Sequence, residues 1–158
     1  MTKTEPASLA LSSVHEAAWR HYLRAHALLI RVLDADLRAQ HGMTLVTYDA
    51  LVQLSEAQNQ QLHMKDLADA LVYSASGLTR LVDALERDGY AHRQIDPANR
   101  RATLVTLTDD GLAALKAAWP THAAGVQRHF ASHTTTTQAR TMATVFHAIR
   151  NDLDDHQA

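Results

Sequence analysis

The sequence predicts a mostly α-helical fold with one small β-hairpin. Apolar residues make up 46% of the 158 residues and aromatic residues only 5%, and the predominance of Ala and Leu favours helices over sheet. Apolar residues recur at helical spacing in several segments, whereas segment 90–107 alternates as paired strands do. The length fits one compact domain, with some apolar surface left over for a partner subunit.

A long first helix is expected over residues 13–40, because this segment contains neither proline nor glycine. Its apolar residues fall on two adjoining faces, which is typical of a helix buried on more than one side. Gly42 is expected to end the helix after His41, since glycine tolerates the left-handed conformation of a C-terminal cap. The apolar positions are Ala18, Trp19, Tyr22, Leu23, Leu29, Ile30, Leu33 and Leu37.

Thr44 is the expected N-cap of a second helix that runs to about Glu56. Met43 before the cap and Tyr48 four positions after it can pair as a hydrophobic staple, which fixes how the chain enters the helix. Residues 57–62 are mostly polar and show no period, so we expect a loop there.

Two further helices are expected, a short one over 64–71 and a longer one over about 74–88, separated by residues 72–74. The longer helix is amphipathic, with apolar residues at the i, i+3, i+4, i+7 spacing that buries one face. Gly89 is expected to end it. The buried face would consist of Leu78, Leu81, Val82 and Leu85, and the outer face of Ser76, Thr79, Arg80, Asp83 and Arg87.

A β-hairpin is expected next, with strands over about 90–95 and 102–107. The turn residues of Asp96 to Arg101 separate the strands and make their connection basic.

Thr108 is the expected N-cap of a further helix, and Asp109 and Asp110 suit the positive end of its dipole. Pro120 is expected to bend this helix or to divide it in two. Residues 134–137 form a turn and cap before a last helix, whose apolar stripe consists of Met142, Val145, Phe146, Ile149 and Leu153.

Composition and motifs exclude several classes of protein. The chain contains no cysteine, which excludes disulfides, thiolate zinc sites and cysteine-based redox sensing. We find neither a signal peptide nor a run of the roughly 20 apolar residues that cross a bilayer, so we expect a cytoplasmic protein with no membrane partner. The five glycines are scattered and form no phosphate loop. We therefore expect neither an enzyme nor a cofactor.

The net charge of −2 does not attract nucleic acid, so DNA binding must depend on local features. Two short helices joined by a tight turn, the second with small polar and basic residues outward, match a helix-turn-helix whose second helix enters the major groove. The alternative is ordinary helix packing. The candidate base-reading residues are Ser74, Ser76, Thr79 and Arg80.

Arg100 and Arg101 lie in the expected hairpin turn. At the tip of a hairpin, a long cationic side chain can reach the narrow, electronegative minor groove of duplex DNA. The alternative is a solvated turn with no partner.

The sequence resembles the MarR family of winged helix-turn-helix transcription regulators in the order and spacing of its motifs, and the likeness extends over nearly the whole chain. The matching motifs are Leu67-Ala68, the run SASGLTRLVDALERDGY from Ser74 to Tyr90, the run DPANRR from Asp96 to Arg101, and the run LTDDG from Leu107 to Gly111.

The resemblance implies a single domain over 1–158 that forms a symmetric homodimer. Helices over about 13–42 and 109–155 would intertwine with those of the partner, and a winged helix-turn-helix over about 44–107 would bind a palindromic operator of double-stranded DNA. The helix from Ser74 would read the major groove, and Arg93, Arg100 and Arg101 would belong to the wing. Relatives usually carry an acid where this chain has Asn99, and many carry a more polar residue where it has Ala75.

The resemblance also implies a small aromatic or anionic effector that binds between the dimerisation helices and the winged part. Among these positions, Asp49, Arg80 and Arg93 are similar to the pattern of urate-responsive relatives. The candidate effector residues are Trp19, Tyr22, Asp49, Arg80 and Arg93. Arg80 and Asp49 have simpler alternative roles in DNA contact and helix packing.

Two other functions stay open. His129 and His133 are four residues apart and follow His122, a spacing that can place two imidazoles on one helix face for a metal-responsive site; exposed polar histidines are the simpler interpretation. The departures at Ala75 and Asn99 also leave open a MarR-like dimer that has lost DNA binding and acts through partners. We expect a ligand-responsive repressor that binds DNA.

Overall fold

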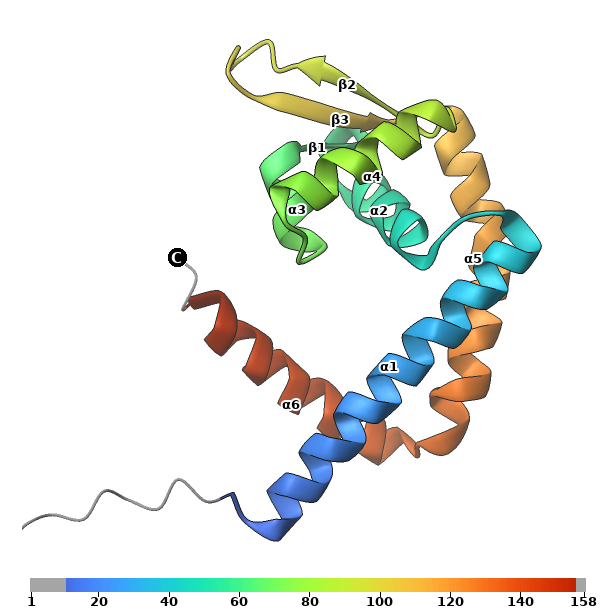
Figure 1. Ribbon diagram of the computed structural model, residues 1–158, viewed down its shortest axis with the longest axis vertical. Coiled ribbons are helices and arrows are strands. Elements are labelled where there is room, and N and C mark those ends of the chain that lie inside the picture. Colours follow the sequence, from blue (N-terminus) through green and yellow to red (C-terminus); the bar gives the residue numbers. More distant parts are fainter. Residues whose placement is uncertain (1–10, 156–158) are drawn as a thin grey trace, which may run out of the picture.

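The computed structural model describes residues 11–155 and has two parts (Figure 1). A winged lobe contains the segment from α2 (Leu45–Glu56) to β3 (Thr103–Leu107). A second part consists of α1 (Ser13–His41) and α5 (Asp109–His129), which pack along each other, and of α6 (Thr136–Asp155). No helix among the described residues is both long and apolar enough to cross a membrane. Residues 1–10 and 156–158 of the expected domain lie outside the described part.

The first helix begins and ends as the sequence predicts. Ser12 caps α1 by accepting the backbone N–H of His15, and Gly42 closes it with a φ of 67° and an N–H that donates to the carbonyl of Arg38. Of the residues of α1, only Leu33 and Leu37 are buried, and both lie toward its C-terminal end. The apolar side chains of its first half are largely exposed.

The next three helices agree with the expected boundaries to within a residue or two. Thr44 caps α2 and Ser74 caps α4 (Ala75–Arg87), each by accepting a backbone N–H three residues later. Between them lies α3 (Met64–Ala70).

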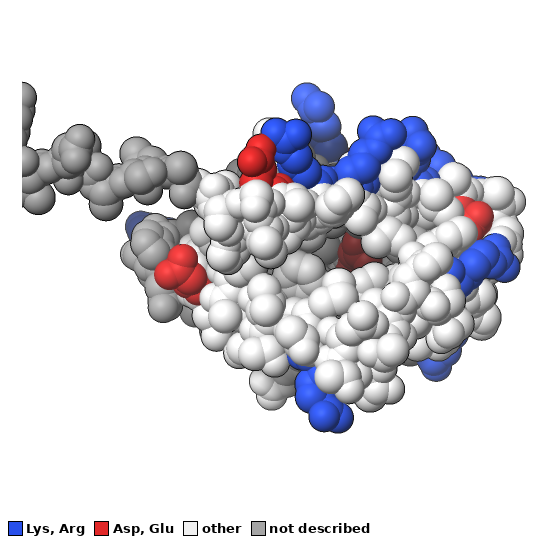
Figure 2. All heavy atoms as spheres, turned by 90° about the horizontal axis from the view of Figure 1, so that it is seen from below, with Lys and Arg blue, Asp and Glu red and all other residues white. Residues whose placement is uncertain are grey.

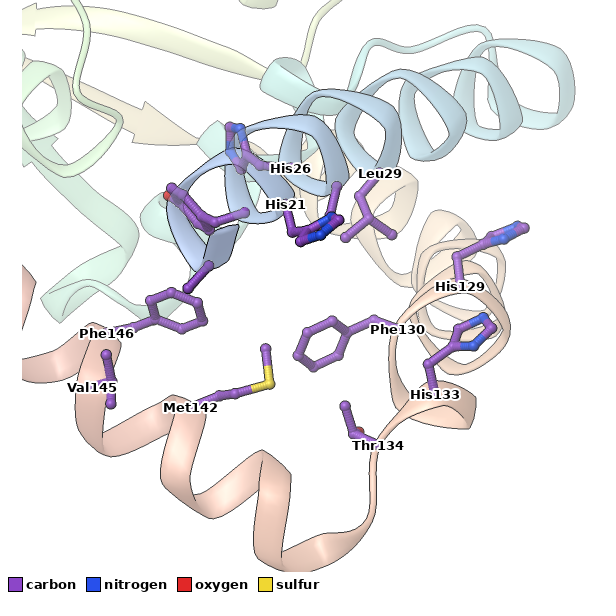
Figure 3. Close-up of a pocket in the computed structure, with 13 residues that line it drawn as sticks. His21, His26, Leu29, His129, Phe130, His133, Thr134, Met142, Val145 and Phe146 are labelled. Carbon is purple, nitrogen blue, oxygen red and sulfur yellow. The ribbon is translucent and has the colours of Figure 1, made fainter. Parts of the chain in front are cut away.

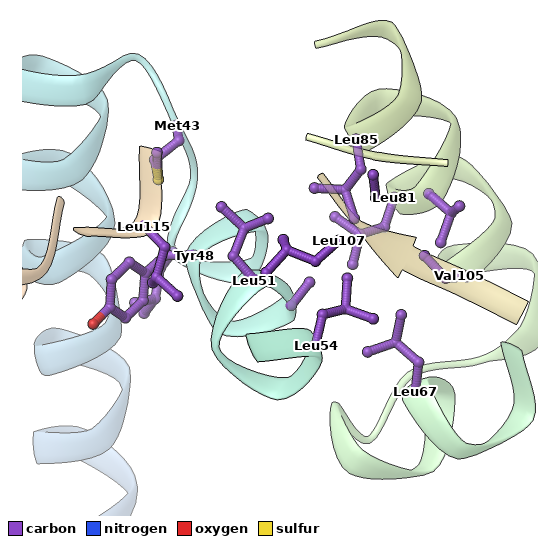
Figure 4. Close-up of a cluster of buried hydrophobic side chains, with 14 of the residues drawn as sticks. Met43, Tyr48, Leu51, Leu54, Leu67, Leu81, Leu85, Val105, Leu107 and Leu115 are labelled. Atoms are coloured by element: carbon purple, nitrogen blue, oxygen red, sulfur yellow. The ribbon is translucent and has the colours of Figure 1, made fainter. Parts of the chain in front are cut away.

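The core of the winged lobe forms where these helices meet the sheet (Figure 4). Tyr48, Leu51 and Leu54 from α2 are fully buried, as are Leu85 from α4 and Val105 from β3. Each fully buried apolar side chain contributes roughly 1.5–3 kcal/mol to folding. The position of α4 relative to the wing is therefore fixed by packing.

The expected loop at 57–62 is wrong. The structure has a short 3₁₀ turn, η1 (Gln58–Gln60), followed by strand β1 (Gln61–His63). The strand pairs antiparallel with β3, with Gln61 opposite Thr106 and His63 opposite Leu104. Its formation depends on a partner more than 40 residues away in the chain, so the local sequence carries no periodic signal for it.

The expected hairpin is confirmed. Strand β2 (Ala91–Ile95) pairs antiparallel with β3 from Ala91 opposite Leu107 to Ile95 opposite Thr103. The sheet order is β1-β3-β2, so β3 is the central strand. Residues 96–102 connect β2 to β3 at the outer end of the hairpin (Figure 1).

Helix α5 runs through Pro120 without dividing, so the predicted division does not occur. Two glycines allow α5 to approach its neighbours closely. A Cβ on Gly111 would lie 2.1 Å from the carbonyl oxygen of Tyr90, and one on Gly125 would lie 2.6 Å from Cδ2 of Leu33. The first contact attaches α5 to the winged lobe, and the second attaches it to α1.

The short turn η2 (Ala131–His133) leads into α6, the last helix, which leaves the far end of α5 (Figure 1). Its described residues are exposed apart from the half-buried Ala139 and Met142. The apolar stripe expected from the sequence therefore faces solvent in a single chain. Its exposed members are Val145, Phe146, Ile149 and Leu153.

Candidate nucleic-acid interface

Helix α4 presents a polar face away from the core. Its apolar residues Leu78, Leu81, Val82 and Leu85 are buried. Ser76, Thr79 and Arg80, predicted to read bases, are exposed on the other side. The structure thus brings the predicted recognition residues together on one accessible surface.

The hydroxyl groups of this face differ in the hydrogen bonds that they already form within the helix. Ser74 uses its hydroxyl oxygen to accept the N–H of Gly77 at 3.2 Å, and this oxygen lies 3.4 Å from that of Ser76. The hydroxyl of Thr79 donates to the carbonyl of Ala75 at 3.0 Å. Ser74 therefore acts first as a helix cap.

The tip of the wing is held by local hydrogen bonds. The N–H of Ala102 donates to the carbonyl of Asn99 at 2.8 Å. The side-chain oxygen of Asn99 accepts the N–H of Arg101 at 3.2 Å. Arg100 and Arg101 are exposed in this turn. Both side chains therefore extend from a loop with a defined backbone and are accessible to a partner.

Arg93, predicted as a wing residue, has a different environment. Its guanidinium binds Glu86, with Nε–Oε2 and Nη2–Oε2 distances of 2.9 and 2.6 Å, and forms a second ion pair with Asp83. The guanidinium and the backbone N–H of Arg93 together lower the pKa of Glu86. Arg93 therefore joins β2 to α4, and its charge is balanced inside the lobe rather than at the wing tip.

His63, which the sequence analysis did not single out, contacts the base of the wing. Its Nε2 lies 2.8 Å from Oδ2 of Asp96. A histidine in a short polar segment carries no signal for a partner 33 residues away, and the contact becomes visible only once β1 is paired in the sheet.

The predicted effector residues do not form one cluster. Trp19 and Tyr22 are neighbours on α1, with ring centroids 5.9 Å apart. Asp49 is half-buried on α2, and burial raises its pKa. Arg80 lies on the outer face of α4, and Arg93 binds Glu86.

Two cavities adjoin Tyr22 instead. A cavity of about 710 Å³ lies between α1, the end of α5 and α6, and Phe130, Met142 and Phe146 contribute to its apolar lining (Figure 3). A second cavity of about 530 Å³ connects α1 and α6 with Val72, in the turn between α3 and α4.

His129 and His133, the candidate metal ligands, both line the larger cavity, but His129 ends α5 and His133 belongs to η2. Within residues 11–155, no three or more His, Cys, Asp or Glu side chains are grouped closely enough to hold a metal ion. The side chains around His129 and His133 therefore give no support to the metal-responsive alternative.

A stacked aromatic pair connects the two parts of the molecule. The rings of Tyr48 on α2 and His122 on α5 are stacked with centroids 4.4 Å apart. Among the described residues, the Tyr48 hydroxyl and His122 Nδ1 are buried without a hydrogen-bond partner. Burial raises the pKa of Tyr48 to about 12 and lowers the pKa of His122, so both rings are held neutral.

Comparison with known proteins finds similarity to transcription regulators. The model of the MarR family matches residues 41–102, which include α2 to α4 and most of the wing. The HTH-type transcriptional regulator YkoM of Bacillus subtilis is 30% identical over 91 residues, which cover 58% of this chain and 58% of that protein. The match thus spans less than two thirds of the curated relative.

Solved structures are similar over more of the chain. Sco3205, a MarR family regulator of Streptomyces coelicolor solved in complex with DNA, is 29% identical with a TM-score of 0.86, covering 91% of this chain and 94% of that one. CouR of Rhodococcus jostii RHA1, solved with p-coumaroyl-CoA, is 25% identical with a TM-score of 0.74, covering 90% and 95%. Its winged lobe thus matches the MarR family model, and over most of its length the chain shares the fold of MarR family transcription regulators.

Proposed function

We propose that the chain is a homodimeric regulator that binds a palindromic operator, with α4 in the major groove and the wing in the minor groove. Ser76, Thr79 and Arg80 read base edges, and Arg100 and Arg101 enter the minor groove. Ser74 caps the recognition helix at the DNA surface. Binding to the chromosome places the protein in the cytoplasm.

One observation carries this proposal, the distribution of unpaired positive charge. The described winged lobe, residues 45–107, contains six Lys and Arg side chains. Arg87 and Arg93 form ion pairs with acids of the lobe. No intramolecular ion pair within residues 11–155 involves the other four, which are Lys65, Arg80, Arg100 and Arg101.

These free cations lie on the helix-turn-helix and the wing tip, the elements that would face DNA. Phosphate contacts by such side chains supply much of protein–DNA affinity and make it dependent on salt. Because the net charge of −2 does not attract DNA, binding depends on where these free cations lie.

Exposed apolar surface supports the homodimer. Figure 2 shows a largely uncharged face with a central hollow, seen from the end of the molecule where α1, α5 and α6 meet. Trp19 is 54% exposed and Ile149 50% exposed, and an apolar surface of this kind marks an interaction site. We propose that residues 13–42 and 109–155 of two copies cover each other here.

A small aromatic or anionic effector would act from the smaller cavity, where Tyr22 and His26 offer stacking and Arg150, which is paired with Asp154, offers a guanidinium. Val72 of the helix-turn-helix lines the same space and has a φ of 53°, which is strained for a β-branched residue and typical of functional turns. A ligand that orders this turn can change the spacing of the two recognition helices and so release a repressor from its operator.

The test is a gel shift with DNA from upstream of the protein's own gene, across a salt series and with an unrelated duplex as competitor. The proposal expects binding that survives the competitor and weakens as salt rises. Equal, weak binding to both duplexes from a protein that is dimeric in solution would instead favour a MarR-like dimer that acts through partners.

A further inference from the structure

The base of the wing is attached to the opposite edge of the sheet through one side-chain contact. His63 ends β1 and directly precedes α3, and Asp96 directly follows β2. The 2.8 Å contact from His63 Nε2 to Asp96 Oδ2 therefore connects the start of the helix-turn-helix with the wing.

Asp96 also forms hydrogen bonds within the turn that carries Arg100 and Arg101. Its other carboxylate oxygen, Oδ1, accepts the N–H of Ala98 at 2.8 Å. Its backbone N–H donates to the carbonyl of Ala102 at 3.0 Å, and its carbonyl accepts the N–H of Asn99 at 3.2 Å. The side chain of Asp96 is only 13% exposed, so its orientation determines how residues 96–102 leave the sheet.

Two acids face the imidazole of His63, and they come from different elements. Asp96 belongs to the wing, and Asp66 of α3 has its Oδ2 3.4 Å from Nδ1. The neighbouring strand β3 contains no titratable residue. The hydrogen bond to Asp96 is the main cause of a raised pKa for His63, and the same bond lowers the pKa of Asp96. A charge-assisted hydrogen bond is stronger than a neutral one.

We infer that His63 is a positioning residue for the wing, which acts through Asp96 to present Arg100 and Arg101 to the minor groove. The inference rests on the proposed DNA binding. Because pairing favours the charged imidazole, its contribution is fully present at low pH and is lost as pH rises through the raised pKa of His63.

A double-mutant cycle tests the inference, with operator affinity measured for wild type, His63→Gln, Arg101→Ala and the double variant. We expect His63→Gln to weaken binding at least about twofold, the low end for residues that interact. The loss should be smaller once Arg101 is absent, because only Arg100 then remains to be positioned. Asp96→Asn should cause a similar loss that does not add to that of His63→Gln. His92→Gln, which removes an exposed imidazole from β2 of the same hairpin, is the matched control.

The pH profile gives a second readout that a general loss of stability would not reproduce. The affinity difference between wild type and His63→Gln should grow as pH falls from about 8 to about 6. Over the same range the affinity of His92→Gln should follow that of wild type. Thermal melting of each variant establishes that the fold is intact.

Three results would overturn the inference. They are unchanged affinity in His63→Gln, a loss that persists undiminished in the Arg101→Ala background, and a further reduction of the salt slope by about 0.9 in that background, which would mean that His63 itself contacts a phosphate. A wild type that binds no duplex specifically would overturn the proposed function, and this inference with it.

Discussion

Arg80 and Arg101 are both exposed cations, but they lie on different elements of the winged lobe, α4 and the wing turn. A guanidinium on a recognition helix can form two hydrogen bonds with one base, whereas one in the minor groove responds mainly to groove width and phosphate potential. Their substitution should therefore affect operator binding in different ways.

Arg80→Ala should lower operator affinity by roughly 1 to 3 kcal/mol, the range for one lost bidentate base contact. It should also relax sequence preference at the base pair concerned. Binding of the variant to a panel of single-base operator variants checks this. Equal losses at every position, or none, would remove Arg80 from the base-reading role.

Arg101→Ala should weaken binding to specific and unrelated duplexes alike. It should also reduce the slope of log affinity against log salt by about 0.9 if the side chain neutralises one phosphate. Titrations at several salt concentrations measure that slope. Arg93→Ala is the informative comparison. Because Arg93 is paired with Glu86, this change should lower the free energy of unfolding and leave the salt slope nearly unchanged.

At the scale of elements, α5 begins in contact with the winged lobe through Gly111. Gly111→Ala places a Cβ 2.1 Å from the backbone oxygen of Tyr90, which cannot move without disturbing the hydrogen bond from Thr108 N–H to that oxygen. The free energy of unfolding should fall by roughly 1 to 3 kcal/mol, as measured by urea denaturation.

Gly125→Ala provides the matched comparison on the same helix. Its added Cβ meets Cδ2 of Leu33 at 2.6 Å, and a side-chain end can shift more easily than a backbone. The loss should therefore be smaller than for Gly111→Ala. The reverse order would contradict the interpretation that the Tyr90 contact fixes the start of α5.

The stacked pair between α2 and α5 predicts a pH dependence. Burial lowers the folded-state pKa of His122 below 6.5, so the unfolded chain takes up this proton first and stability is lost as pH falls below that value. Chemical denaturation of wild type and His122→Phe between about pH 7.5 and pH 5.5 measures the effect. The variant should lose less stability on acidification, and parallel curves would assign the dependence elsewhere.

The elements predicted from sequence are those with strong local signals. The caps at Thr44 and Thr108 and the glycine at Gly42 set helix ends within a few residues of themselves, and the structure confirms all three. Strand β1 was missed because its hydrogen bonds depend entirely on β3.

The same distinction holds for the candidate site. The exposure of Arg80 and Arg100 follows from the amphipathic pattern and the turn composition. The ion pair of Arg93 with Asp83 and the contact of His63 with Asp96 join residues 10 and 33 positions apart in the chain. Such pairs depend on how strands and helices pack, which the periodicity of one segment does not determine.

At the scale of the whole molecule, the two parts expose different kinds of side chain. The winged lobe carries free cations on α4 and the wing, and α1 and α6 carry exposed apolar side chains such as Tyr22 and Phe146. The chain is similar to DNA-binding regulators that are not enzymes, as its sequence leads us to expect. We expect two copies to join through α1 and α6 and to place two α4 helices about one turn of DNA apart.

The measurement that tests this account most directly is the stoichiometry and specificity of binding to the DNA upstream of the protein's own gene, by analytical ultracentrifugation of the complex with a salt-dependent gel shift. The account predicts one dimer on one operator, with binding that survives unrelated competitor DNA and falls steeply with salt. A protein that binds the upstream and unrelated duplexes equally weakly, or that binds as a monomer, would contradict it.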